Sequence, residues 1–193
     1  VGGTKNIRSL NLHTDSDGLV RGVPLFVDVE KDGVITKQPG FALELTARAI
    51  AAEPSSEGVT ASLGDFIIPG GALNVLTLNF DDRPGAIPIY SFGDLFHCAK
   101  LGNVAYFKNN FAGKTVIMGA VLDLQDRRLA SNRFIVSPDA VGAPQPCFTN
   151  PQTTTGIARR ATPGALIHAT AINNLLQRDV VNIVAPGPGT AII

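Results

Sequence analysis

The sequence has few charged residues and no long apolar run, and each shortage excludes a class of function. Charged residues make up 17% of the 193 residues, and the 16 basic side chains balance the 16 acidic ones. A nucleic-acid partner normally demands a basic face, so this balance argues against one. No apolar run reaches the roughly 18 to 20 residues that cross a bilayer. The longest smooth run, Val116 to Leu124, has the length of a strand.

Cysteine is also scarce, because Cys98 and Cys147 are the only two in the chain. Two cysteines are too few to define a disulfide scaffold by count, and neither lies in a Cys-x-x-Cys pair of the metal-binding type. In a reducing compartment they would be buried thiols, and in an oxidising one they are natural disulfide partners. Such a bridge would stabilise the fold by about 4 kcal/mol by restricting the unfolded chain.

What is plentiful is apolar sequence, at 45% of the residues, which is a globular composition. A chain of this length can bury a substantial core and predicts a single domain over 1–193. The chain begins at Val1 without a methionine or a signal peptide. We therefore expect it to be a piece of a longer protein.

The first third of the sequence predicts an antiparallel meander. Lys5 to His13 alternates apolar and polar residues, and Val20 to Glu30 is rich in β-branched residues. The dipeptides Asp17-Gly18 and Asp32-Gly33 are typical of type I′ turns, which need positive φ at both central positions. Two such turns flanking one strand predict three strands, the last at Val34 to Thr36.

Farther along, helical and strand patterns alternate. Helices are predicted over 39–52, ended by Pro54, over 92–100, with Ser91 as N-cap and Asp94 completing a capping box, and over 164–178. Strands are predicted at 66–68, 75–80, 115–122 and 180–184, and loops over 55–71 and 137–163. The continuous apolarity of 115–122 favours a strand buried on both faces. The fold class is therefore mixed α/β, with a mixed sheet that includes the meander and has flanking helices.

Two sequence patterns imitate ligand-binding motifs without completing them. Gly113-Lys114-Thr115 resembles the end of a phosphate-binding loop, but the glycine required five positions earlier is replaced by Lys108. Asp15-x-Asp17-Gly18 resembles the middle of a calcium loop, but Pro24 stands where a bidentate glutamate is needed. We read both as turns and expect no metal site.

A cysteine nucleophile is the main catalytic alternative. His97 adjoins Cys98, but neighbouring residues on a helix point about 100° apart, so His97 is poorly placed to activate the thiol. His168 could serve as the base, although nothing in the sequence brings it near Cys98. The other interpretation is a half-cystine beside a surface histidine, with no catalytic residue in the chain.

A polar cluster follows the predicted buried strand. Ligands of open α/β sheets bind beyond the carboxyl ends of the strands. The best candidates for a polar or anionic ligand are therefore Asp123, Asp126, Arg127, Arg128 and Arg133, with His168 on the last helix. The competing interpretations are a solvated salt-bridge network for the charged residues and a buried, hydrogen-bonded side chain for His168.

Three blocks of residues, in this order, resemble the CHASE family of type two. The blocks are Asp15-x-Asp17-Gly18-x-x-Arg21-x-x-Pro24-Leu25; Tyr90-Ser91-Phe92-Gly93-Asp94-Leu95 joined to Phe111-Ala112-Gly113-Lys114-Thr115-Val116-Ile117-Met118-Gly119; and Pro163-Gly164-x-x-Ile167-His168-Ala169-x-Ala171-Ile172-Asn173-x-Leu175-Leu176. They span most of the chain from residue 10 to residue 178. The charged stretch Leu122 to Arg128 is similar to the subset carried by alphaproteobacterial cyclases.

The resemblance implies a sensor that does not catalyse. Domains of this family are extracytoplasmic inputs of bacterial cyclases, histidine kinases and serine/threonine kinases. It implies a periplasmic location, tethering to the inner membrane through adjoining segments, a disulfide between Cys98 and Cys147, and an adenylate or guanylate cyclase as output. A small molecule or a protein would be the ligand, a homodimer is a candidate assembly, and no cofactor is expected.

The family usually opens with a strand-helix-strand unit of roughly a hundred residues before the first block, and nothing here corresponds to it. We therefore expect the chain to be the C-terminal fragment of a larger sensory domain. Two other hypotheses stay open at this point. One is a small cysteine-dependent α/β enzyme using Cys98 and His168, and the other is a structural dimerisation module.

Overall fold

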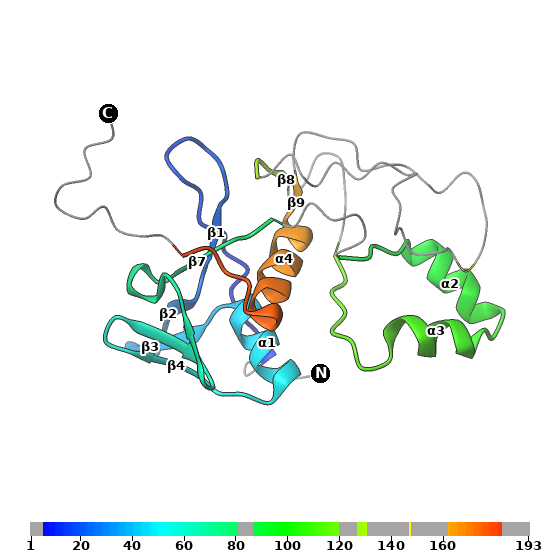
Figure 1. Ribbon diagram of the computed structural model, residues 1–193, viewed down its shortest axis with the longest axis horizontal. Helices are drawn as coiled ribbons and strands as arrows, with labels where there is room; N and C mark the ends of the chain where they lie inside the picture. Colours follow the sequence, from blue (N-terminus) through cyan, green and yellow to red (C-terminus); the bar gives the residue numbers. More distant parts are fainter. Residues whose placement is uncertain (1–5, 81–86, 120–126, 131–146, 148–161, 183–193) are drawn as a thin grey trace. The chain divides into compact units, whose positions relative to one another are not determined.

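The computed structural model describes residues 6–80, 87–119, 127–130, 147 and 162–182 (Figure 1). The chain divides into two compact units, one made of Val1–Asn79 with Ala171–Ile193 and the other of Phe80–Thr170. Each unit is presented by itself below. Both helices and sheets are present, which confirms the mixed α/β class. In the described part the strands form four small sheets, and every pairing in them is antiparallel.

The predicted hairpin at Asp32-Gly33 is confirmed in the first unit. Strand β2, Phe26–Lys31, pairs with β3, Val34–Pro39, in a register that places Lys31 opposite Val34. Asp32 has φ 53° and Gly33 has φ 76°, so both central positions take the positive φ that a type I′ turn demands. A two-residue loop of this kind fixes the register of the strands on either side.

The turn predicted at Asp17-Gly18 is present, but it is not of type I′ and no strand precedes it among the described residues. Only Gly18 has positive φ there, at 80°. Two backbone hydrogen bonds close the turn, from Gly18 N to Asp15 O and from Asp15 N to Leu19 O, both at 2.9 Å. Asp17 Oδ1 also accepts the Leu19 N–H at 3.0 Å. Residues 7–12 form no strand, and only an isolated bridge joins His13 to Gly22. The backbone of this segment instead bonds to the start of the next helix, where Phe41 N donates to Ser9 O at 3.2 Å.

Helix α1, Phe41–Ile50, confirms the prediction over 39–52. Its buried residues Ala42, Leu43, Thr46 and Ala47 recur at helical spacing and form one face. The helix ends where Ala51 takes a left-handed conformation, three residues before Pro54.

The stretch over 55–71, predicted to be loop-like, is mostly a three-stranded meander. Strands β4, Pro54–Glu57, β5, Thr60–Leu63, and β6, Phe66–Ile68, pair in sequence order, which confirms only the strand at 66–68. Short turns that carry positive-φ glycines, Gly58 and Gly64, join them. Serine, glycine and glutamate suggest a loop locally, but Ala61, Leu63 and Ile68 are buried and hold the strands in place.

Strand β1, Gly22–Pro24, and strand β7, Val75–Thr77, form the sheet beside the pocket discussed below. β7 confirms the core of the strand predicted at 75–80. A Cβ on Gly22 would lie 2.4 Å from the side-chain atom Val75 Cγ1 and 3.0 Å from the backbone atom Leu76 O, so a larger residue there would press on β7. The short 3-10 helix η2, Gly71–Leu73, leads into β7 through Asn74.

In the second unit, helix α2 spans Phe92–Lys100, as predicted, with Ser91 as its N-cap residue. The Ser91 side chain makes no capping hydrogen bond, so its half of the predicted capping box is wrong. Helix α3, Val104–Phe111, was not predicted. Its start is marked by Asn103, whose Oδ1 accepts the Tyr106 N–H at 3.1 Å, a standard N-cap interaction.

The buried strand predicted at 115–122 is wrong for its described part. Residues 115–119 have no strand pairing, and Val116 and Met118 are 54% and 80% exposed. Residues 120–122 lie outside the described residues. Periodicity can report that a run is apolar but not whether a neighbouring strand exists to pair with it.

The last predicted helix is confirmed as α4, Gly164–Gln177, which follows the two-residue strand β9, Thr162–Pro163. β9 pairs with β8, Arg127–Arg128. A Cβ on Gly119 would lie 2.5 Å from Ala165 Cβ, so glycine is needed for the close approach to the first turn of α4. The strand predicted at 180–184 is wrong for 180–182, which are irregular, and 183–184 lie outside the described residues.

Candidate functional site

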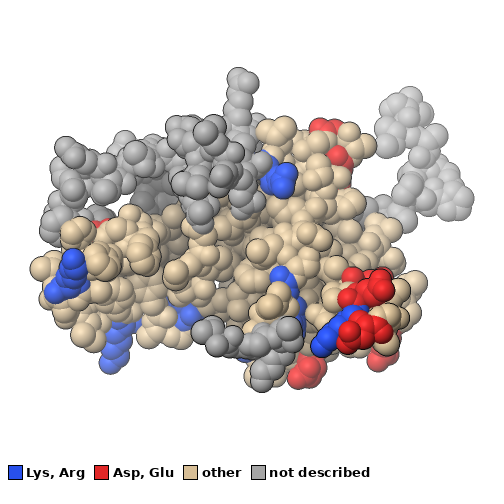
Figure 2. All heavy atoms as spheres, turned by 180° about the vertical axis from the view of Figure 1, so that it is seen from behind, with Lys and Arg blue, Asp and Glu red and all other residues tan. Residues whose placement is uncertain are grey.

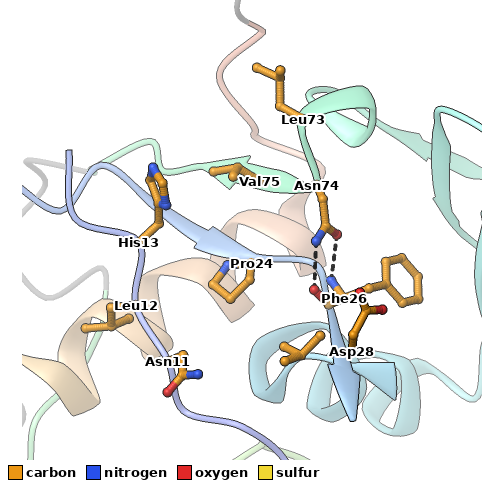
Figure 3. A pocket seen from close by; sticks show the side chains of 10 residues that line it. Asn11, Leu12, His13, Pro24, Phe26, Asp28, Leu73, Asn74 and Val75 are labelled. Atoms are coloured by element: carbon orange, nitrogen blue, oxygen red, sulfur yellow. Dashed lines mark hydrogen bonds between the residues drawn. The ribbon is translucent and has the colours of Figure 1, made fainter. Parts of the chain in front are cut away.

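A hollow of about 410 Å³ opens in the first unit (Figure 3). Three segments distant in sequence line it: Asn11, Leu12 and His13; Pro24, Phe26, Val27 and Asp28 of β1 and β2; and Leu73, Asn74 and Val75 of η2 and β7. The irregular segment that carries Asn11 and His13 runs along one side, and Asp28 and Asn74 lie along the other. Binding sites for small molecules commonly combine such an apolar lining with a few polar groups.

Asn74 builds one wall of this pocket. Its φ of 53° is left-handed, a conformation that asparagine tolerates better than most residues. Its Oδ1 accepts the Phe26 N–H at 2.9 Å, and its Nδ2 donates to Phe26 O at 2.7 Å. The side-chain amide therefore imitates a neighbouring strand and satisfies the backbone where β1 passes into β2. Asn74 O also accepts the Leu25 N–H at 3.0 Å.

A charged cluster adjoins the pocket through His13, whose Nε2 lies 3.7 Å from Asp15 Oδ1. Arg21 Nη1 donates to Asp15 Oδ2 at 2.7 Å, and Arg21 Nη2 donates to Asp17 Oδ2 at 2.7 Å. The hydrogen bond from Arg21, then that from the Leu19 N–H, hold the pKa of Asp17 below its usual value. The same pairings, with Asp17 first and Asp15 second, raise the pKa of Arg21. Both carboxylates are therefore paired with Arg21, which agrees with reading Asp15-x-Asp17-Gly18 as a turn.

A hydrogen-bonded path leads from the pocket to the last helix. Asn74 is followed directly by β7, and Asn79 lies two residues beyond that strand. Asn174 of α4 accepts the Asn79 N–H with its Oδ1 and donates to Asn79 O with its Nδ2, both at 2.9 Å. Asn174 is 2% exposed, so this second amide clamp is buried.

Three contacts fix the residues that follow α4. Asn79 Nδ2 donates to Asp179 Oδ1 at 3.0 Å. Arg178 Nη2 lies 2.5 Å from Asp65 Oδ1 in the turn between β5 and β6, and the Arg178 guanidinium lies 5.4 Å from the centre of the Phe66 ring. The hydrogen bond from Arg178, then its charge, lower the pKa of Asp65. The end of α4 is thus attached to the unit that contains the pocket.

In the second unit, Cys98 of α2 and Cys147 form a disulfide, as predicted, with their Cα atoms 5.7 Å apart. Cys98 is fully buried. Asp94 lies one turn before it, is 8% exposed and accepts the Cys147 N–H with Oδ2 at 2.9 Å. A sulfur in a disulfide offers no thiolate, which argues against the cysteine-dependent enzyme.

Aromatic rings pack beside α2, the helix that carries Cys98. The ring centres of Tyr90 and Phe111 are 4.7 Å apart, and Tyr90 Oη donates to Asn110 Oδ1 at 3.2 Å. Burial, then the nearby charge of Asp94, raise the pKa of Tyr106. Gly113, with φ 70°, follows α3 in a turn, in agreement with reading Gly113-Lys114-Thr115 as a turn.

The predicted ligand residues are only partly placed by the structure. Asp123, Asp126 and Arg133 lie outside the described residues. Arg127 and Arg128 form β8, paired in register with Pro163 and Thr162, and Arg128 is exposed. His168 lies on α4 and is 6% exposed, so its side chain is buried as the competing interpretation holds. Their role in ligand binding stays a prediction.

Reasoning from the sequence missed the pocket residues Asn11, His13, Asp28 and Asn74, and the clamp residue Asn174. One signal was available for Asn74, because Gly70-Gly71 marks a turn and asparagine tolerates the left-handed conformation that turns use. Among the described residues, no three His, Cys, Asp or Glu side chains gather closely enough to hold a metal ion.

The described residues combine a disulfide with an open pocket lined by apolar and polar side chains, and such a pocket suits a binding domain. A family model described as the CHASE2 domain matches residues 3–192. The chain therefore belongs to the CHASE2 family, whose domains are extracytoplasmic sensory domains of signalling receptors. Searches of curated proteins and of solved structures found no match.

Membership of this family confirms the resemblance drawn from the three blocks. It agrees with a sensor rather than an enzyme. In the part of the chain that the structure describes, no helix combines the length and the apolarity needed to cross a membrane.

Proposed function

We propose that this chain is the input domain of a bacterial transmembrane receptor whose output is an adenylate or guanylate cyclase. The observation that carries the proposal is the family match over residues 3–192. The disulfide between Cys98 and Cys147 supports it, because such bonds persist outside reducing compartments. In this proposal the domain lies in the periplasm, adjoining segments tether it to the inner membrane, and it catalyses nothing itself.

The pocket in the first unit is where we place the ligand. Asn11, His13 and Asp28 offer an amide, an imidazole and a carboxylate, and Pro24 and Val75 contribute apolar surface. A small molecule with both hydrogen-bonding and apolar parts would suit this lining. A cation or an amine would find a partner in Asp28, and a neutral polar group would find one in Asn11.

The hydrogen-bonded path to α4 suggests how binding is relayed. A ligand shifts a conformational equilibrium only by its difference in affinity for the two states. Asn74 contributes to the pocket, and Asn79, five residues later, is clamped by Asn174 of α4. A ligand that moves the Asn74 wall would therefore act on the segment from β7 to Asn79, and Asn174 of the last described helix clamps the end of that segment.

The full-length gene gives the first test. We expect it to encode membrane-spanning segments and a cyclase domain downstream of this region. A downstream kinase domain would keep the sensor but change the output. A gene without any membrane-spanning segment would overturn the proposal.

Ligand screening gives the second test. Thermal-shift measurements with a library of polar metabolites should find a compound that stabilises the chain, since a ligand at 100 times its Kd contributes about 2.7 kcal/mol. His13→Ala and Asp28→Asn should abolish the shift, whereas Arg127→Gln with Arg128→Gln should preserve it. The reverse result would move the site to the charged segment predicted from the sequence.

Light scattering separates the sensor from a purely structural dimerisation module. A stable homodimer that no compound stabilises would favour the structural role. A ligand-dependent shift at either oligomeric state would favour the sensor.

A further inference from the structure

Helices α2 and α3 expose an unusual amount of apolar surface. Phe92 and Phe96 of α2 are 69% and 50% exposed, and Leu101 and Val104, on either side of the turn between the helices, are 68% and 73% exposed. Water makes such exposure unfavourable, and contiguous exposed apolar surface marks interaction sites. We call these four residues, together with Lys100 and Lys108, the α2–α3 face.

The residues of this face follow helical rows. Phe92, Phe96 and Lys100 are spaced by four, so they form one row on the side of α2 opposite Asp94 and Cys98, its buried residues. The Lys100 ammonium lies 4.5 Å from the centre of the Phe96 ring. Val104 and Lys108 have the same spacing on α3, and both are exposed. Each row begins with apolar side chains and ends in a lysine.

The charges of this segment have one sign at the surface. Residues 87–119 contain three lysines, at positions 100, 108 and 114, and all three are exposed. The single carboxylate in the segment is Asp94, which is 8% exposed and bonded to the Cys147 N–H. In Figure 2, the part that holds α2 and α3 (left) is mainly tan with separate blue patches.

Exposed apolar side chains flanked by lysines are the composition of surfaces that lie in the interface of a bilayer. There the apolar groups enter the boundary between headgroups and acyl chains, and the lysines meet anionic headgroups. A second copy of the chain would bring lysines against lysines, which charge repulsion opposes. A bilayer also needs no shape complementarity to protruding phenylalanines.

We propose that the α2–α3 face is a docking surface for an anionic lipid bilayer. Phe92, Phe96, Leu101 and Val104 insert at the headgroup boundary, and Lys100 and Lys108 contact lipid phosphates. This contact involves neither the ligand pocket nor the output domain. The bilayer proposal and the proposed function can therefore be tested independently of each other.

Vesicle flotation with the whole 193-residue chain tests the proposal. The vesicles contain phosphatidylcholine alone or phosphatidylcholine with about 30% phosphatidylglycerol. The comparison therefore tests the effect of the negative headgroup charge. We expect binding to the anionic vesicles at low salt and little binding to neutral vesicles. Binding should be lost in 0.5 M salt, because the Debye screening length there is only about 4 Å.

Variants locate the contact. Lys100→Gln and Lys108→Gln should each weaken binding about fivefold, and Phe92→Ser with Phe96→Ser should remove most of it. The matched control is Val34→Ser with Ile35→Ser on β3, whose parent side chains are 61% and 69% exposed. This control should bind as the parent does. Retention of the disulfide and of the circular dichroism spectrum checks that each variant is folded.

Three results would overturn the proposal. They are equal binding to neutral and anionic vesicles, equal loss of binding in the β3 control, and unchanged binding by the Phe92→Ser/Phe96→Ser variant. A dimer that dissociates when these phenylalanines are replaced, without any vesicle binding, would assign the face to self-association instead.

Discussion

Two asparagines perform the same task at distant points of the first unit. Asn74 and Asn174 each accept one backbone N–H and donate to the carbonyl of the same residue, Phe26 and Asn79 respectively. An amide is suited to this because it carries a donor and an acceptor side by side. Both clamps satisfy backbone groups where a strand lacks a neighbour, so asparagine replaces part of a β-ladder at each point.

Replacing Asn174 by alanine should destabilise the fold. The change removes two hydrogen bonds and leaves the N–H and C=O of Asn79 without their protein partner, so we expect a loss of about 2 kcal/mol in the free energy of unfolding. Urea denaturation measures it. The control is Asn173→Ala, the same change at the neighbouring helix position, which is only half-buried. Equal losses for the two variants would show that the clamp contributes nothing.

The carboxylate of Asp17 gives a prediction about pH. Because the folded pKa lies below the usual value of 3.8, the stabilising contribution of Asp17 is complete above that pH. It is lost as the pH falls through the folded pKa. The hydrogen bond from Arg21 is the largest cause of the low pKa of Asp17. In the Arg21→Gln variant, the pKa of Asp17 should therefore rise toward 3.8.

Carbon-detected NMR titration of the carboxylates measures this pKa directly. Asp65 is the internal control, because Arg178 rather than Arg21 lowers its pKa. The pKa of Asp65 should therefore be the same in the parent chain and in Arg21→Gln. If the pKa of Asp17 stays low in the variant, the Leu19 N–H rather than the guanidinium governs it.

At the scale of elements, the sequence predicted those helices and turns that local residues determine. It did not predict the strands that depend on pairing with distant segments. The Asp32-Gly33 turn and the helix over 92–100 were predicted from local residues and are confirmed, although the Ser91 side chain does not cap the helix. The meander over 54–68 was missed because long-range burial of Leu63 and Ile68, rather than local propensity, holds it. Helix α3 was missed because its sequence, VAYFKNNF, has no regular apolar spacing and none of its residues is buried, so only the Asn103 N-cap signals its start.

The pocket was beyond sequence reasoning for a related reason. Its lining comes from three segments whose positions depend on the pairing of β1 with β7 and on the Asn74 clamp. No periodicity reports such pairing. The disulfide was accessible, by contrast, because two cysteines allow only one intramolecular pairing, Cys98 with Cys147.

That disulfide should make a large contribution to stability. It closes a separation of 49 residues, so its removal should lower the free energy of unfolding by about 4 kcal/mol if the loop-entropy model holds. Thiol titration of the native chain should find no free thiol before reduction and two cysteine thiols after it. The Cys98→Ser/Cys147→Ser variant should match the reduced chain and be insensitive to reductant. An oxidised chain that is no more stable than this variant would contradict the prediction.

At the scale of the whole chain, the contacts fall into two compact units that share helix α4. The first turns of α4 belong with Phe80–Thr170, and its last turns, from Ala171, belong with Val1–Asn79. The disulfide lies entirely in the former unit, whereas the pocket, the Asn174 clamp and the Asp65–Arg178 pair lie in the latter. Stability in proteins is commonly distributed over such cooperative regions.

Hydrogen exchange should therefore respond to the disulfide unevenly. In the Cys98→Ser/Cys147→Ser variant, the amides of α2 and α3 should exchange faster, because Cys147 no longer holds α2 through the bridge. The amides of α1 and of the β2–β3 hairpin should keep their protection, since their hydrogen bonds among the described residues stay within the first unit. Asn174→Ala should show the opposite pattern, with faster exchange around β7 and the end of α4. A uniform increase across both units in either variant would mean that the chain unfolds as one cooperative body, with α4 as the element that transmits instability between them.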